Sequence, residues 1–153
     1  MAALGPKMLE LAAARARGAH PYFTPVKHTA FAREHLGPGK LLAPEMACVV
    51  DTDRERARAA ARRYAESYLR MRNYTSNLRR IGFTDEDIAD GGSDRLLDAV
   101  VPQGAAADVA KAAQAHLDAG ADHVCLQPVG VSGIPREHWS AIAEALGLER
   151  ILR

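Results

Sequence analysis

The sequence has almost no net charge: 20 basic and 19 acidic residues leave +1 over 153 residues. Non-specific nucleic-acid binding requires a broad positive field, so no nucleic-acid partner is expected. No apolar run approaches the ~20 residues that a membrane-spanning helix needs, which excludes a membrane partner. The first residues also lack a basic stretch followed by an apolar one, so no secretory signal is expected. We therefore predict a cytoplasmic protein.

Cysteines and recognisable catalytic motifs are equally scarce. The two cysteines, Cys48 and Cys125, each stand alone within an apolar run, which predicts buried free thiols in a reducing compartment. His28 and His35 are seven residues apart, on one helical face, but a third ligand is missing, so no metal site is predicted. A glycine-rich dinucleotide fingerprint, a Walker-type loop, a Cys-x-x-Cys pair and a nucleophile elbow are all absent.

Helical and strand patterns alternate along the chain. A strand is predicted over 44–50, where Met46–Val50 form a continuous apolar run typical of strands covered on both faces in a parallel sheet. A second strong strand is predicted over 122–127. A shorter extended piece is predicted over 19–23. Thr52 to Glu55 reads as a capping box that opens a long helix. Further helices are predicted over 6–17, 24–36, 74–81, 85–89, 93–101, 106–119 and 135–146.

This alternation predicts an α/β fold with a parallel sheet. A closed (β/α)₈ barrel typically takes roughly 250 residues and eight strands, whereas this sequence has 153 residues and three clear strand patterns. The chain also opens with a loop and a helix at the point where a strand of a β/α unit would end. We therefore expect the back half of a larger barrel.

Four segments resemble the bacterial luciferase-like oxidoreductases, a family that includes monooxygenases: 2–12 (AALGPKMLELA), 18–23 (GAHPYF), 74–82 (YTSNLRRIG) and 116–124 (HLDAGADHV). In combination they are similar to the actinobacterial branch that uses coenzyme F420. The resemblance implies a partial (β/α)₈ TIM barrel, with residues 1–153 as a single incomplete domain that corresponds to the C-terminal half. It also implies hydride transfer to or from F420, or alternatively flavin mononucleotide (FMN), on a small organic substrate.

The loop Leu4-Gly5-Pro6-Lys7 is the first candidate site. It stands at a predicted helix N-terminus, where free N–H groups and the helix dipole attract phosphate. Glycine permits close approach of the backbone to a ligand, and Lys7 adds a positive charge. In the resembling family this loop holds the cofactor, so Leu4, Gly5, Pro6 and Lys7 are predicted to bind it. The alternative interpretation is a plain β/α turn.

Two further groups of residues are weaker candidates. His20 lies at a strand end, where a barrel builds its active site, and is the predicted catalytic residue. The alternative is a structural histidine beside a Tyr22 packed in the barrel wall. Asn77, Arg79 and Arg80 are predicted to bind substrate, because arginine suits a phosphate or carboxylate. The alternative for these is a solvated helix surface. His123 is expected in the core.

Two function classes remain open at this level. One is an F420- or flavin-dependent oxidoreductase of the luciferase-like family. The other is a non-catalytic, truncated remnant or a half-barrel that binds a partner. Because half of a ligand pocket would be missing, we expect weak cofactor binding by this chain alone. An open inner face and free strand edges predict self-association to a homo-oligomer, unless the helix over 135–146 covers that face.

Overall fold

The structure is a computed structural model that describes residues 1–148. Positions 149–153 lie outside the described residues. The elements, in chain order, are α1 (Pro6–Arg15), β1 (Gly18–Ala19), α2 (Val26–Leu36), β2 (Leu41–Leu42), β3 (Glu45–Val50), α3 (Arg54–Leu69), α4 (Arg72–Ile81), α5 (Asp85–Ile88), α6 (Asp94–Val100), β4 (Gln103–Gly104), α7 (Ala106–Asp118), β5 (Cys125–Pro128) and α8 (Arg136–Ala145). No helix within this described part is both long and apolar enough to span a bilayer.

The strands form a parallel arc in which β1, the segment 41–50 and β5 lie side by side in that order. The segment 41–50, which contains β2 and β3, is its centre. Its odd-numbered residues donate their N–H groups toward β1; for example, the N–H of Ala43 donates to the carbonyl of Ala19 at 3.0 Å. Its even-numbered residues accept from the other neighbour, for example Pro44 from Cys125 at 2.9 Å. β1 and β5 therefore flank the centre on opposite edges, as successive strands of a barrel do.

The arc extends by one more segment. The N–H of His20 donates to the carbonyl of Met1 at 2.9 Å, and the terminal ammonium of Met1 donates to Gly18 O at 2.9 Å. Residues 1–3 therefore lie against β1, and the loop at Leu4 leaves the carboxyl end of this first segment. β4 pairs with Val49 and Val50, on the same edge of the central segment as β1.

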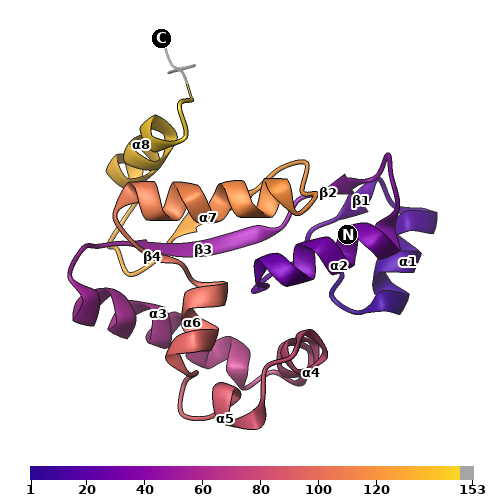
Figure 1. The fold of residues 1–153 in the computed structure, drawn as a ribbon, viewed down its shortest axis with the longest axis horizontal. Helices are drawn as coiled ribbons and strands as arrows, with labels where there is room; N and C mark the ends of the chain where they lie inside the picture. The colour runs from indigo at the N-terminus through magenta and orange to yellow at the C-terminus, as the bar shows by residue number, and fades with distance from the viewer. Residues whose placement is uncertain (149–153) are drawn as a thin grey trace.

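Helices cover both faces of the central segment (Figure 1). Leu42, Met46 and Cys48 face α1, α2, α7 and α8, which form the helical layer expected outside a barrel. Ala47 and Val49 face the opposite side and pack against α3 and α6. We call this second side the concave face. The sequence did not predict that the helices between β3 and β4 would cover part of it.

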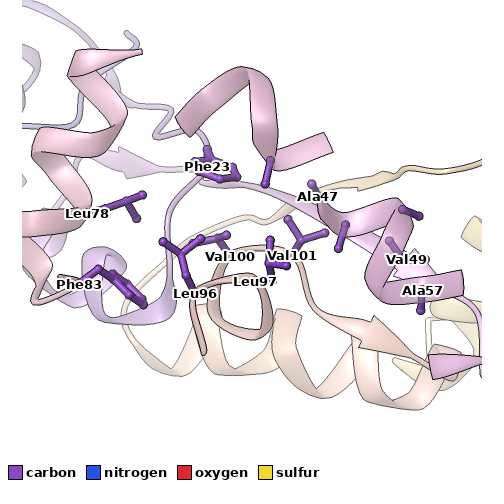
Figure 2. Packing of buried hydrophobic residues seen from close by; sticks show 13 residues of the cluster. Phe23, Ala47, Val49, Ala57, Leu78, Phe83, Leu96, Leu97, Val100 and Val101 are labelled. Atoms are coloured by element: carbon purple, nitrogen blue, oxygen red, sulfur yellow. The ribbon is translucent and has the colours of Figure 1, made fainter. Parts of the chain in front are cut away.

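The largest core cluster joins these helices to β3. Figure 2 shows the side chains of α6 between Leu78 and Phe83 on one side and Ala47 and Val49 on the other. Helix α3 contributes mainly alanines at helical spacing (Ala57, Ala60, Ala61 and Ala65), so its backbone lies close to the strand. Helix α3 also lies close to the turn after β5. At Gly130 there is no room for a side chain, because an added Cβ would stand 2.9 Å from Ala60 Cβ.

Most predicted elements are present, with three local corrections. The N-cap of α3 is Asp53, whose carboxylate accepts from the N–H of Arg56 at 2.9 Å, so the predicted Thr52 capping box is wrong. His123 is exposed rather than part of the core. Helix α8 does not cover the concave face, because Ile142 packs with Met46 and Cys48 on the opposite side.

Candidate functional site

The loop Leu4-Gly5-Pro6-Lys7 forms an uncapped helix start. Gly5 is the N-cap of α1 and makes no side-chain cap, and Pro6 occupies the first helical turn. The Gly5 carbonyl accepts the N–H groups of Met8 and Leu9 at 3.1 and 3.0 Å. Helix geometry leaves the earlier N–H of Lys7 without an intrahelical acceptor. The loop therefore presents free N–H and the positive end of the α1 dipole at the carboxyl end of the first segment.

Arg80 brings a positive charge to this loop from 75 residues farther along the chain. Three atoms of its guanidinium lie 3.7–3.9 Å from the point where a Cβ on Gly5 would stand. Its Nη1 donates to Asn77 Oδ1 at 3.1 Å, one turn earlier on α4. Asn77 is buried, and its amide Nδ2 has no hydrogen-bond partner. The sequence predicted Asn77 and Arg80 as a site separate from the loop, whereas the structure places Arg80 beside Gly5.

His28 supports the same loop from α2. Its Nε2 lies 2.8 Å from the carbonyl oxygen of Leu4. Because a carbonyl only accepts, Nε2 carries the proton and Nδ1 is a lone pair, which is buried without a partner. Burial, and then the nearby charge of Arg80, lower the pKa of His28 against the opposing effect of the Leu4 hydrogen bond. A neutral His28 therefore fixes the Leu4 backbone and leaves one acceptor free.

Arg79 and Lys7, the other two predicted binding residues, are both exposed. Arg79 forms an ion pair with Asp85 at 2.6 Å, so its charge is engaged away from Gly5. Lys7 belongs to the first turn of α1. Their predicted roles in substrate and cofactor binding stay predictions.

His20 lies at the end of β1, on the concave face. Its Nδ1 lies 2.5 Å from the carbonyl oxygen of Ala43, which fixes Nδ1 as the protonated nitrogen and leaves Nε2 as an acceptor. The ring stands edge-on to Tyr22 at 6.1 Å between centroids. Tyr22 is half-buried, and its hydroxyl donates to Gln127 Oε1 on β5 at 2.5 Å. The predicted catalytic role of His20 stays a prediction.

Sequence reasoning missed Glu45, the first residue of β3. Its side chain is 4% exposed, accepts from the N–H of Phe23 at 3.4 Å, and lies 3.5 Å from the hydroxyl of Tyr64. Burial raises the pKa of Glu45 to about 7, against the lowering effect of these two contacts. One signal was available in the sequence: Glu45 is the only charged residue in an otherwise apolar strand.

A cavity of about 360 Å³ lies where β3 and β5 end. It is lined by Arg56 and Arg63 of α3, by the turn at Gly130 and by His138 of α8. Arg56 is engaged by Asp51 and Asp53 at 2.8 and 2.7 Å. The cavity is separate from the Gly5 loop, whose residues do not line it.

No protein-family model and no curated protein matches the chain. Solved structures match its fold, among them two F420-dependent enzymes. One is a coenzyme F420-dependent tetrahydromethanopterin reductase from Methanopyrus kandleri, with a TM-score of 0.71 and 19% identity over 97% of this chain. The other is an F420-dependent secondary alcohol dehydrogenase, solved with an F420–acetone adduct, with a TM-score of 0.63 and 15% identity over 95% of this chain.

The chain spans about half the length of these proteins, 49% and 47% respectively. At these identities the likeness shows the fold. The prediction of an α/β fold that corresponds to part of a larger (β/α)₈ barrel is confirmed.

Proposed function

We propose that the chain belongs to the luciferase-like oxidoreductases and carries the phosphate-binding part of a coenzyme F420 site. The observation that carries this proposal is the position of Arg80 over Gly5. A guanidinium beside a free helix N-terminus is a recurrent arrangement for binding phosphate. The reductase and the alcohol dehydrogenase of similar fold are F420-dependent, which favours F420 over the alternative, FMN.

The residues at the loop fit a phosphate-bearing cofactor. The Lys7 N–H and the Arg80 guanidinium supply donors, and the buried Asn77 Nδ2 lacks a partner. Gly5 presents no side chain, so a ligand oxygen can approach its backbone directly. Lys7 and Arg80 also supply positive charge, and the N-terminus of α1 adds the favourable end of the helix dipole.

When bound, the deazaflavin would supply hydride transfer to or from a small organic substrate. This chain's own residues would position the reactants. Leu4, Gly5, Pro6 and Lys7 hold the phosphate-bearing tail, and His28 fixes the loop through the Leu4 carbonyl. His20 then presents Nε2, and Gln127 its amide, on the concave face where the substrate would lie. The free thiols of Cys48 and Cys125 support a cytoplasmic location as part of the proposal.

A fluorescence titration with F420 tests the phosphate site. Arg80→Ala should weaken binding by about tenfold, which is the factor for about 1.4 kcal/mol of a charge-assisted contact. Arg79→Ala is the matched control, because it removes the same charge from the same helix but from a side chain paired with Asp85. Equal effects of the two variants, or no effect of Arg80→Ala, would refute the assignment. We expect the affinity of this chain to be weaker than micromolar.

The second candidate function is a half-barrel that binds a partner, including a second copy of itself. In residues 1–148, β5 pairs only with β3, and on its other edge the carbonyl of Leu126 accepts from Trp139 Nε1 at 3.4 Å, so this edge is only partly satisfied. Ile134 and Trp139, which follow β5, are 65% and 43% exposed. An open edge next to exposed apolar side chains favours association with another chain. Partner binding with no response to F420 would support this candidate over the first.

A further inference from the structure

All four tyrosines of the chain gather around the buried carboxyl group of Glu45. Tyr22 follows β1, Tyr64 and Tyr68 belong to α3, and Tyr74 belongs to α4. The Tyr68 ring lies 5.7 Å from Tyr22, 5.0 Å from Tyr64 and 5.0 Å from Tyr74, between centroids. Only 5% of the residues are aromatic, so this convergence does not follow from composition.

The hydroxyl groups in this cluster form a row that begins at the carboxyl group. Tyr64 Oη lies 3.5 Å from Glu45 Oε1 and 3.3 Å from Tyr68 Oη. The Tyr22 ring stacks on that of Tyr68. Burial is the main cause that raises the pKa of Tyr64 and of Tyr68, and the nearby Tyr22 hydroxyl raises both further. Tyr22 itself donates to Gln127, an exposed residue of the concave face. The row therefore leads from a buried carboxyl group to the open side of the arc.

A hydroxyl has one proton, so Tyr64 donates to only one of its two neighbours at a time. When Glu45 is ionised, Tyr64 donates to the carboxylate and accepts from Tyr68. When Glu45 is protonated, the carboxyl group donates to Tyr64, and Tyr64 donates to Tyr68. The direction of hydrogen-bond donation along the row therefore reverses when Glu45 gains or loses its proton. A proton relay requires this property.

We propose that Glu45, Tyr64, Tyr68 and Tyr22 form a relay that passes a proton between the buried carboxyl group and a small carbonyl or alcohol substrate on the concave face. The inference rests on the proposed function. In the reducing direction the carbonyl π bond breaks, its carbon accepts the hydride that the reduced deazaflavin supplies, and its oxygen accepts the proton. Glu45 is left as a carboxylate and regains a proton from solvent. In the oxidising direction each transfer is reversed.

The surroundings of Glu45 suit this role. The titratable groups around it are Tyr64 and Tyr68 of α3, Tyr74 of α4, Cys125, its neighbour on β5, and Tyr22, which stacks on Tyr68. Cys48 of β3 lies on the opposite side of the strand. None of the groups that shift the pKa of Glu45 is a cation, and burial raises that pKa to about 7. A carboxyl group with a pKa near neutrality both gives and takes a proton readily.

A purely structural role for Glu45 is the competing explanation. Its carboxylate accepts the N–H of Phe23, a residue with φ of 53°, and so holds a turn that side chains rarely adopt. That role does not need the hydroxyl groups of Tyr64 or Tyr68. The two explanations therefore differ in what removal of one tyrosine hydroxyl does.

The first test follows the carboxyl C=O band of Glu45 by infrared difference spectroscopy against pH, with Glu45→Gln to assign the band. Tyr64→Phe should raise the titration midpoint of Glu45, because the hydroxyl that stabilises the carboxylate is removed. Tyr74→Phe is the matched control from the same cluster and should leave the midpoint unchanged. Equal midpoints in the wild type and Tyr64→Phe would overturn the relay. This readout needs neither cofactor nor substrate.

The second test measures single-turnover reduction of a small ketone by F420-loaded protein, with F420 affinity measured separately by fluorescence. Glu45→Gln and Tyr64→Phe should slow the proton-dependent rate at least tenfold and remove its pH dependence near 7, with F420 affinity unchanged. Tyr74→Phe should retain both. Equal rates in Tyr64→Phe and Tyr74→Phe would overturn the proposal. Failure of every variant to bind F420 would refute the proposed function instead, and the infrared titration would still decide whether the relay exists.

Discussion

Glu45→Gln should change how the stability of the fold depends on pH. The pKa of Glu45 rises from 4.5 to about 7 on folding, so the folded state holds a proton that the unfolded chain releases. The stability that this proton contributes is fully present below pH 4.5 and is lost as the pH rises through 7. The shift corresponds to about 3.4 kcal/mol in total, of which about 2.5 kcal/mol is lost between roughly pH 5 and pH 8.

His116 changes the stability of the fold with pH in the opposite direction to Glu45, so the two contributions can be told apart. Burial, and then the electrostatic interaction with His28, lower the pKa of His116 from 6.5 to about 4. Stability from this group is present above pH 6.5 and is lost as the pH falls toward 4, by about 2 kcal/mol between roughly pH 8 and pH 5. In the wild type the two groups nearly cancel over this interval.

Urea unfolding at several pH values separates the two contributions. Glu45→Gln should become more stable as the pH rises from about 5 to about 8, because only the histidine effect remains. His116→Gln should show the reverse slope. The difference in free energy of unfolding between wild type and Glu45→Gln should change by about 2.5 kcal/mol over the interval. A difference that stays constant with pH would refute the buried, protonated state of Glu45.

Three further outcomes follow from contacts in the fold. Gly18→Ala should destabilise the protein by about 3 kcal/mol or more in urea unfolding, because the new Cβ would stand 1.8 Å from the Leu41 carbonyl oxygen; a loss under about 1 kcal/mol would contradict the close strand pairing. Arg33→Lys should cost about 2 kcal/mol, since Arg33 donates to three backbone carbonyls and to Asp122; unchanged unfolding would show these bonds to be dispensable. Ile134→Ser should reduce the concentration-dependent self-association expected from light scattering, and a wild type that remains monomeric at high concentration would remove that expectation.

Local sequence patterns were sufficient for most of the elements. The apolar run before Val50 predicted β3, and Pro6 and Ser93 marked the starts of α1 and α6 as the structure has them. The Thr52 prediction failed because two neighbouring residues, Thr52 and Asp53, are both good N-caps. The carboxylate of Asp53 also pairs with Arg56, which favours it as the cap.

The candidate site depended on long-range contacts that local patterns do not encode. Arg80 and Gly5 are far apart in sequence, and only the return of α4 over the arc brings them together. The same return brings Tyr74 beside Tyr68 near Glu45. Periodicity predicted α4 as a helix, but it carried no information on which face α4 would cover. The family resemblance supplied the Leu4-Gly5-Pro6-Lys7 loop, and the structure added Arg80 to it.

The most direct test of the central claim is an amide NMR titration of this 153-residue chain with F420 up to millimolar concentration, with FMN titrated in parallel. We predict that F420 shifts the amide signals of Gly5, Lys7 and Arg80 and leaves the cavity near Gly130 unaffected. These shifts should be lost in Arg80→Ala, retained in Arg79→Ala and weaker with FMN. Shifts confined to the Gly130 cavity, equal loss in both variants, or no shift at all would contradict a cofactor phosphate site at the start of α1.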